Sequence, residues 1–163
     1  MPPGNPNKDA LDLIRSESVL TLATCDGIGP WSAPVYFVCL EGGFYFFSSP
    51  HSRHIQQAMR SGKASASLFC QADSWQTIRG IQMKGSMDRI SDPALSMKVI
   101  SAYLKRFPFT RDFFPAIRKP DPKTFFDRFK AKLFAFRPTE VYYVDNRHGF
   151  GSRQKIEWRT QAS

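Results

Sequence analysis

Short apolar runs, rich in β-branched and aromatic residues, alternate along the chain with Gly, Pro and polar turns. Runs of this length, bounded by turn residues, predict strands. The expected strands cover residues 19–24, 31–40, 44–48, 64–69, 76–89, 132–137, 139–145 and 154–159. The two strands that flank Pro138 are expected to form a closing hairpin. Apolar residues occupy both faces of the 31–40 strand, which is typical of a closed barrel that also packs against a partner or a ligand.

Apolar residues at helical spacing predict three helices outside these strands. The helices are expected over residues 8–16, 50–61 and 94–105. Asn7 or Asp9 is the expected cap of the first helix, and Asp92 that of the third. Ser49 is the expected cap of the second, with Pro50 at the favoured first helical position.

The long strand over 76–89 has one apolar and one polar face. The apolar face holds Ile81, Met83 and Met87, and the polar face holds Gln82, Lys84 and Ser86. Gly80 and Gly85 would allow the bulges or sharp bends that a barrel requires. The whole pattern predicts a mainly β chain with peripheral helices. We expect a single domain over residues 1–163, in which 93–130 is a helical and loop elaboration.

Composition narrows the class of protein. Of the 163 residues, 42% are hydrophobic and 23% charged, which is typical of one globular domain with a real core. The apolar runs are too short for a membrane-spanning helix. The three cysteines lack a CxxC spacing and so argue against a disulfide framework or a zinc site. Because the N-terminus also lacks a secretory pattern, we expect a cytoplasmic protein.

The positive charge is concentrated in one part of the chain. The net charge is +9, and all of it lies in residues 98–163, with ten basic and three acidic residues in 98–132 alone. This asymmetry suggests an acidic or phosphorylated partner. The mixture of Phe, Arg and Lys in 106–132 could bind single-stranded nucleic acid. Core Phe residues covered by long cationic side chains explain such a mixture more often, so nucleic acid is the weaker interpretation.

The clearest candidate for chemistry is the segment Ser48-Ser-Pro-His-Ser-Arg-His54, which joins a strand to a helix. Helix N-termini favour anions, because their first backbone N–H groups are free and the helix dipole is positive there. Arg53 can hold a phosphate with two parallel hydrogen bonds, and the Ser48 and Ser52 hydroxyls can donate to it. The alternative interpretation is ordinary capping beside a solvated basic turn.

Other candidate sites are weaker. Gln82 and Lys84 could contact a ligand outside the barrel, but a solvent-facing strand edge is the preferred explanation for them. The 145–153 segment could be a ligand-binding loop, although turns of this composition are common. The histidines lack a metal-binding spacing, and the sequence contains neither a nucleophile elbow nor a P-loop.

Four segments together resemble the FMN-binding split barrel of the pyridoxamine 5'-phosphate oxidase superfamily. They are Leu20-Thr-Leu-Ala-Thr, Ser32-Ala-Pro-Val-Tyr-Phe, Phe44-Tyr-Phe-Phe-Ser-Ser-Pro-His-Ser-Arg-His and Arg79-Gly-Ile-Gln-Met-Lys-Gly. The resemblance spans about residues 10–90 and resumes at 132–159. A small uncharacterised bacterial branch is more similar still. It shares the Arg79 motif, Arg106-Phe-Pro, Asp145-Asn-x-x-Gly-Phe-Gly and Ile156-x-Trp158.

The resemblance implies a homodimer with FMN at its interface and a flavin-dependent oxidoreductase activity on a small molecule. By position, Ser48, Arg53 and His54 would hold the FMN phosphate, with Ser52 nearby. The backbone of Pro34, Val35 and Tyr36 would lie along the flavin ring, with Gln82 at its polar edge. Lys84, Gln82 or a basic residue of 98–132 would stabilise charge on the reduced ring or hold an anionic substrate.

The sequence also departs from the oxidase proper. Basic residues of the oxidase are replaced by Ser32 and Phe37, its flavin-contacting glutamine by Gly80, and a lysine by His54, and its C-terminal Arg-x-His motif has no counterpart. Pyridoxamine phosphate oxidation is therefore not the expected reaction. The alternative is a flavin-free binding module for haem, another phosphorylated small molecule or an anionic macromolecule.

Overall fold

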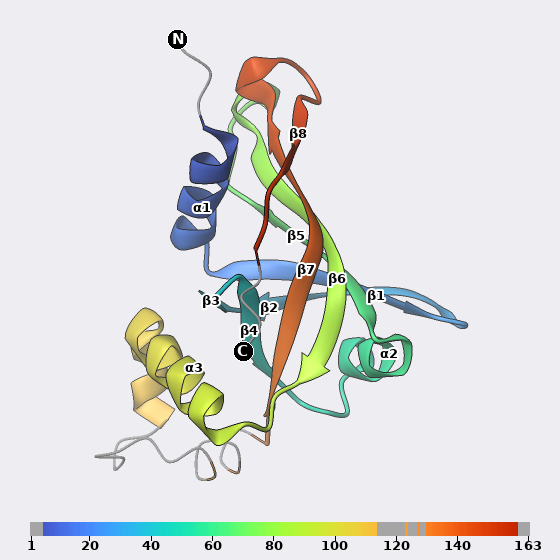
Figure 1. Ribbon diagram of the computed structural model, residues 1–163, viewed down its shortest axis with the longest axis vertical. Coiled ribbons are helices and arrows are strands. Elements are labelled where there is room, and N and C mark those ends of the chain that lie inside the picture. The colour runs from blue at the N-terminus through green and yellow to red at the C-terminus, as the bar shows by residue number, and fades with distance from the viewer. Residues whose placement is uncertain (1–4, 114–122, 124–126, 128–129, 160–163) are drawn as a thin grey trace.

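The computed structural model describes residues 5–113, 123, 127 and 130–159. These residues form one curled antiparallel sheet with helices around it (Figure 1). The strands are β1 (Val19–Asp26), β2 (Gly29–Tyr36), β3 (Val38–Leu40), β4 (Gly43–Ser48), β5 (Lys63–Phe69), β6 (Arg79–Arg89), β7 (Lys132–Asp145) and β8 (Arg153–Ile156). The α-helices are α1 (Pro6–Ser16), α2 (Arg53–Ser61) and α3 (Pro93–Arg106), and the 3-10 helices are η1 (Trp75–Thr77), η2 (Pro108–Phe113) and η3 (Asn146–His148).

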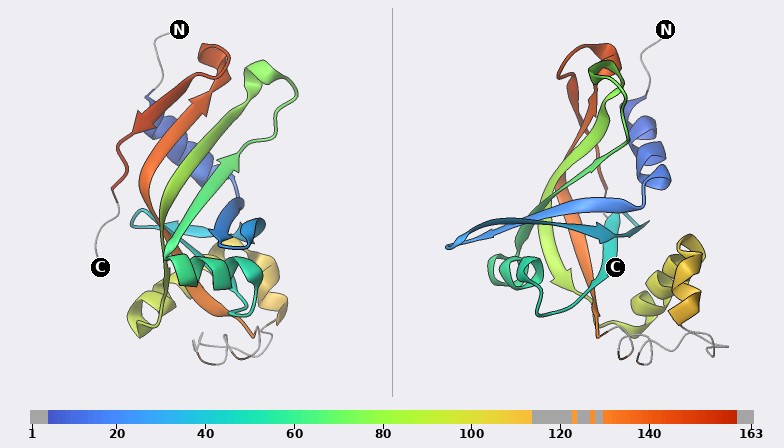
Figure 2. Two further views of the ribbon diagram at one scale, coloured as in Figure 1. Left: turned by 90° about the vertical axis from the view of Figure 1, so that its right-hand side faces the viewer. Right: turned by 180° about the vertical axis from the view of Figure 1, so that it is seen from behind.

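The sheet is a half-barrel with β2 at one edge. Its strand order is β2-β1-β5-β6-β7-β4-β3, and β8 pairs with β7. The two long strands β6 and β7 rise through the molecule, and the β1–β2 hairpin crosses them (Figures 1 and 2). In Figure 1 and in the right-hand view of Figure 2, α2 and α3 lie at opposite ends of the β1–β2 hairpin. This mainly β architecture with peripheral helices confirms the fold expected from the sequence.

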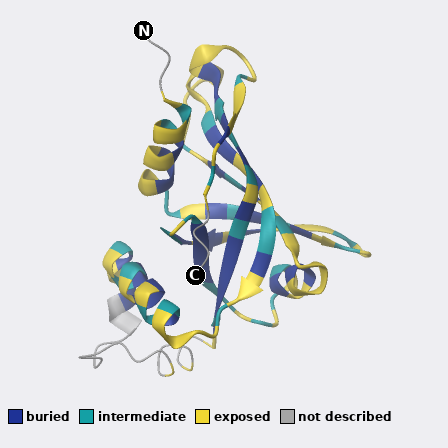
Figure 3. Ribbon diagram, in the orientation of Figure 1, coloured by how far each residue is buried: buried dark blue, intermediate teal, exposed yellow. Residues whose placement is uncertain are grey.

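Two hydrophobic clusters hold the fold together. The main cluster fills the concave side of the sheet and includes buried residues of α1 and α2. The smaller cluster packs α3 against β3, β4 and β7. Strand β4 serves both, because Phe44 and Phe46 enter the first and Tyr45 enters the second. Burial is accordingly concentrated along the central strands, whereas the hairpin tip and outer helix faces are exposed (Figure 3).

Two strand predictions were wrong. The 31–40 run is not one strand, because the chain changes partners at the fully buried Phe37: β2 pairs with β1, and β3 pairs with β4. The expected hairpin around Pro138 is the single strand β7. Pro138 lies where β6 and β7 shift register between Lys84 and Gly85, so its missing N–H does not interrupt a regular ladder.

The bulge also explains why Gly85 is a glycine. A Cβ there would lie 2.0 Å from the carbonyl oxygen of Arg137, a contact no side chain permits. The prediction that the long strand has an apolar face of Ile81, Met83 and Met87 is confirmed, since all three are buried. That strand begins later than expected, at Arg79, because residues 75–77 form η1.

The helix boundaries differ from the predicted ones at the N-termini. Asn5 caps α1, in place of Asn7 or Asp9. Ser52 is the N-cap of α2, in place of Ser49, so Pro50 precedes the helix. Asp92 caps α3 as expected, accepting a hydrogen bond from the backbone of Leu95. The last strand ends at Ile156, three residues before the predicted end.

The basic elaboration is described in part. Helix α3 and the turn η2 cover residues 93–113, and most of the segment from 114 to 129 lies outside the described residues. Within the described part, none of the helices has the length and apolar character that crossing a membrane requires.

Candidate functional site

The strand-to-helix turn gathers three of the predicted phosphate ligands. Ser48 ends β4, and its Oγ lies 2.9 Å from His54 Nε2 and 3.2 Å from Ser52 Oγ. The Ser52 hydroxyl also donates to the carbonyl of Ser49 at 2.8 Å. The side chains of Ser48, Ser52 and His54 are only partly buried. This cluster therefore offers two hydroxyls and one imidazole at a single point of the surface.

The N-terminus of α2 adds positive potential to this cluster. Ser52 makes no side-chain capping bond to the helix, and the first turn contains no acidic residue. The N–H groups of a helix's first turn have no partner within the helix. Burial lowers the pKa of His54, so its imidazole is neutral at neutral pH and can accept a hydrogen bond. A phosphate arriving here would meet free donors and no fixed negative charge.

Arg53 connects the turn to the edge strand of the sheet. Its guanidinium lies 4.6 Å from the centroid of the Trp31 ring, which is a cation–π contact. Trp31 belongs to β2, the strand predicted to run along the flavin ring. The contact places the exposed cation of α2 beside the start of that strand.

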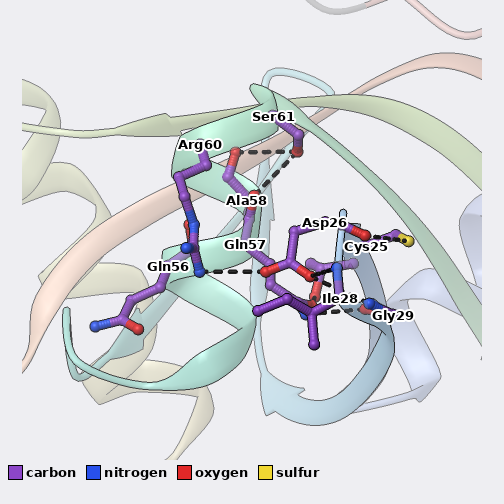
Figure 4. A network of polar contacts seen from close by, with 10 residues as sticks. Cys25, Asp26, Ile28, Gly29, Gln56, Gln57, Ala58, Arg60 and Ser61 are labelled. Atoms are coloured by element: carbon purple, nitrogen blue, oxygen red, sulfur yellow. Dashed lines mark hydrogen bonds and ion pairs between the residues drawn. The ribbon is translucent and has the colours of Figure 1, made fainter.

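A buried amide fixes α2 against the β1–β2 hairpin. The Thr24 hydroxyl lies 2.7 Å from Gln57 Oε1, and Gln57 Nε2 donates to the Gly29 carbonyl at 3.0 Å. Arg60 forms an ion pair with Asp26 at 3.2 Å on the same side of the helix (Figure 4). The two hydrogen bonds of Gln57 hold the helix that carries the phosphate cluster in one position relative to β2, whereas the ion pair of the exposed Arg60 contributes little.

The other end of β2 is covered by the basic elaboration. Pro34 and Tyr36 are exposed, whereas Val35 is buried in the core. The Tyr103 hydroxyl of α3 donates to the Tyr36 carbonyl at 3.1 Å. Burial raises the pKa of Tyr103 far above its usual value, so the hydroxyl remains a donor. Strand β2 thus lies between the phosphate cluster at its start and α3 at its end.

Gln82 and Lys84 lie on the outer face of the sheet, away from the turn. The register Pro34–Thr21–Ser67–Gln82 separates Pro34 from Gln82 by three strand spacings, or about 14 Å. Lys84 forms an ion pair with Glu140 at 3.3 Å. Within one chain these two residues do not join the phosphate cluster.

The positions that depart from the oxidase have structural reasons. Phe37 is fully buried in the barrel core, where a basic side chain would have no partner. A Cβ on Gly80 would lie 3.0 Å from the carbonyl oxygen of Leu68, so the backbone approach is tight there as well. Ser32, in contrast, is exposed on β2.

None of the three histidines sits in a metal-binding group of the described residues. His54 Nε2 is engaged by the serines, and His51 is exposed. His148 lies 3.8 Å from the buried carboxylate of Asp145. At 3.8 Å this contact is longer than a hydrogen bond, and the Asp145 carboxylate is already paired with Arg147, so it does not fix the orientation of the His148 ring.

A cavity of about 530 Å3 lies elsewhere, between α1, the β3–β4 turn and the segment after β8. None of the predicted site residues lines it. Its Cys39 is largely buried, and burial raises the pKa of that thiol to about 11. The thiol is therefore protonated at neutral pH and is not a ready nucleophile.

Sequence reasoning missed the contacts that hold the site together. Trp31 had no signal beyond its place in an apolar run, and Gln57 was one polar residue among several on α2. The contact between Tyr103 and Tyr36 joins segments far apart in the chain. Each of these pairs depends on tertiary structure.

A family profile and a curated relative both match most of the chain. The profile described as pyridoxamine 5'-phosphate oxidase matches residues 7–145. A UPF0306 protein of Klebsiella pneumoniae (strain 342) is 30% identical over 135 residues, which are 81% of this chain and 78% of that protein.

Solved structures resemble the chain at lower identity. A heme binding protein from Mycobacterium smegmatis has a TM-score of 0.70 at 19% identity, covering 96% of this chain and 59% of that one. A FAD-binding protein from Mesorhizobium loti has a TM-score of 0.62 at 13% identity, covering 82% and 90%. At these identities the likeness establishes the fold, a split barrel.

Proposed function

The chain belongs to the pyridoxamine 5'-phosphate oxidase family, and on that premise we propose that it binds FMN as the cofactor of a redox reaction on a small molecule. The observation that carries the proposal is the cluster of Ser48, Ser52 and His54 at the N-terminus of α2, with Arg53 as the first residue of that helix. It supplies neutral donors, one exposed guanidinium and free backbone N–H groups. These are the groups that a phosphate monoester requires.

The edge strand β2 suits the flavin ring. Among the described residues no strand pairs with its outer edge, so backbone groups around Pro34 and Val35 can reach a ligand, whereas the Tyr36 carbonyl is already bound by the Tyr103 hydroxyl. When bound, flavin supplies hydride transfer. The chain's own residues bind the phosphate and position the ring along β2. At position 37 the chain has a buried Phe in place of a basic residue. The buried Phe37 and the tight Gly80 support a reaction other than pyridoxamine phosphate oxidation.

We also propose that two copies associate through the outer face of the sheet. That face carries small side chains on neighbouring strands, at Thr21, Ala23, Ser32, Ser65 and Ser67. In such a dimer the partner's Gln82 and the partner's Lys84 could complete a site that one chain leaves open. Light scattering on the purified protein tests this, and a monomer at micromolar concentration would contradict it.

Comparing FMN with riboflavin tests the phosphate cluster, since riboflavin lacks only the phosphate. We expect FMN to bind more tightly than riboflavin, as measured by quenching of flavin fluorescence. Arg53→Ala removes a charge-assisted hydrogen bond and should weaken FMN binding about 10- to 100-fold, with little effect on riboflavin.

Arg60→Ala is the matched control, because Arg60 is exposed in the last turn of the same helix. It should leave FMN affinity within about twofold of the wild type. Equal affinities for FMN and riboflavin in the wild type would contradict the assigned phosphate site.

Haem is the second candidate ligand. The Mycobacterium smegmatis protein with this fold is a heme binding protein, and the exposed imidazole of His148 is a candidate axial ligand. A haem-binding chain would show a Soret band that His148→Ala abolishes. Retention of that band in the variant would contradict this assignment.

A further inference from the structure

Five aromatic rings form a continuous row of contacts from the smaller hydrophobic cluster to the end of β2. Phe47 and Tyr103 have ring centroids 4.9 Å apart, and Tyr103 and Phe107 are 4.7 Å apart. Phe107 then contacts Tyr36 at 5.3 Å and Phe109 at 5.8 Å, and Tyr36 and Phe109 are themselves 5.7 Å apart. The elaboration formed by α3 and η2 therefore packs directly against the strand proposed to hold the flavin ring.

Exposure rises sharply toward the end of this row of rings. Tyr103 and Phe107 are buried, with 7% and 3% of their surface exposed, whereas Tyr36 and Phe109 are 49% and 48% exposed. The outer pair meets at 60°, so the edge of one ring faces the other ring. Half of the surface of both residues remains free, and aromatic faces prefer edge-to-face or offset contacts with another aromatic ring.

The outer rings are held in place. The Tyr103 hydroxyl bonds the Tyr36 carbonyl, and the backbone N–H of Thr110 donates to the Phe107 carbonyl at 2.9 Å. Thr110 is buried and also donates its hydroxyl to that carbonyl, which fixes the turn that carries Phe109. A surface held in this way binds without losing much conformational freedom.

We propose that Tyr36 and Phe109 form a stacking wall that selects a planar aromatic molecule as the substrate of the flavin site. The inference rests on the proposed function, because an aromatic molecule at this wall would react with the flavin ring bound along β2. Pro34 and Tyr36 lie about 7 Å apart along β2, so the wall adjoins the backbone proposed to bind the ring. Lys105 is exposed in the last turn of α3, whereas Arg106 is bound to backbone carbonyls at the end of α1, so Lys105 is the cation near the wall that can attract an aromatic anion.

The test measures binding by calorimetry in the FMN-loaded protein, with 2-naphthoate as a flat probe that flavin does not oxidise. Decahydro-2-naphthoate has the same charge and a similar size but no flat ring. We expect 2-naphthoate to bind more tightly than its saturated analogue. Phe109→Leu should weaken 2-naphthoate about three- to tenfold and leave the analogue unchanged, and Phe109→Trp should restore the binding.

Phe150→Leu is the matched control, because Phe150 is 82% exposed and contacts Trp75 at another part of the sheet. It should not change the affinity for either probe. A protein that takes up FMN but binds both probes equally, or in which Phe109→Leu has no effect, overturns this inference alone. A protein that takes up no FMN overturns the proposed function and the inference together.

Discussion

Gln57 links the helix of the phosphate cluster to the β1–β2 hairpin, and its removal should both destabilise the protein and loosen the site. The residue is 1% exposed, and its amide bridges the Thr24 hydroxyl and the Gly29 carbonyl. Gln57→Leu fills similar space but makes neither hydrogen bond. The Thr24 hydroxyl is then buried without a partner, and the Gly29 carbonyl loses its donor.

The magnitude follows from these two groups. A buried polar group left unsatisfied costs about 1–3 kcal/mol. Thr24 is 3% exposed, so its unsatisfied hydroxyl should cost a value near the upper end of that range. The Gly29 carbonyl is only partly buried and can form a hydrogen bond with water instead, so its cost is smaller. We expect Gln57→Leu to lower the free energy of unfolding by about 2–4 kcal/mol.

Urea denaturation followed by circular dichroism measures this loss. Gln56→Leu is the matched control, because Gln56 is exposed on the same helix, and it should change stability by less than about 0.5 kcal/mol. The double variant Thr24→Val with Gln57→Leu replaces both partners by apolar groups. It should be more stable than Gln57→Leu alone, because it removes the unsatisfied hydroxyl.

Two results would refute this reasoning. One is a loss below about 1 kcal/mol for Gln57→Leu, which would mean that the hydrogen bonds contribute little. The other is a double variant less stable than the single one. In either case the position of α2 would depend on its apolar contacts alone.

Three further predictions follow from the same structure. Because burial lowers the pKa of His54, the unfolded state binds the proton more readily, and the unliganded protein should lose stability as pH falls below about 6.5. A bound FMN phosphate favours the charged imidazole, so the affinity for FMN should rise from about pH 8 to about pH 6. A fluorescence titration in which His54→Gln shows the same dependence of FMN affinity on pH as the wild type would contradict this. Gly85→Ala places a Cβ on the β7 backbone and should cost more than about 3 kcal/mol in urea denaturation, whereas Gly27→Ala meets nothing within 4 Å and should be nearly neutral. Tyr103→Phe removes the hydrogen bond to Tyr36 and should lower the thermal midpoint by a few degrees, for a loss of about 1 kcal/mol; an unchanged midpoint would show that packing alone holds α3.

The sequence predicted a strand correctly where the alternation of apolar and polar residues alone determines its buried face. Alternation identified the buried face of β6, since Ile81 and Met83 point into a single core. It could not predict that β7 continues through Pro138, because that depends on a register shift in β7 opposite Lys84 and Gly85 of the neighbouring strand. The break at Phe37 is likewise a consequence of which strand pairs with which.

The same limit applies to the site. The cluster from Ser48 to His54 was predictable because its members lie within one turn and act through a helix N-terminus. The partner of Arg53 on β2 and the partner of Tyr36 on α3 come from distant segments. No periodicity or local motif reports such contacts, so only the folded structure could bring them together.

The most direct test of the central claim is the visible spectrum of the purified protein after incubation with FMN and gel filtration. The account predicts that the bands of oxidised flavin elute with the protein, and that Arg53→Ala releases the flavin. A protein that elutes without flavin after saturating FMN would contradict it. A Soret band in the protein as purified, with no uptake of FMN, would replace flavin by haem as the ligand of this split barrel.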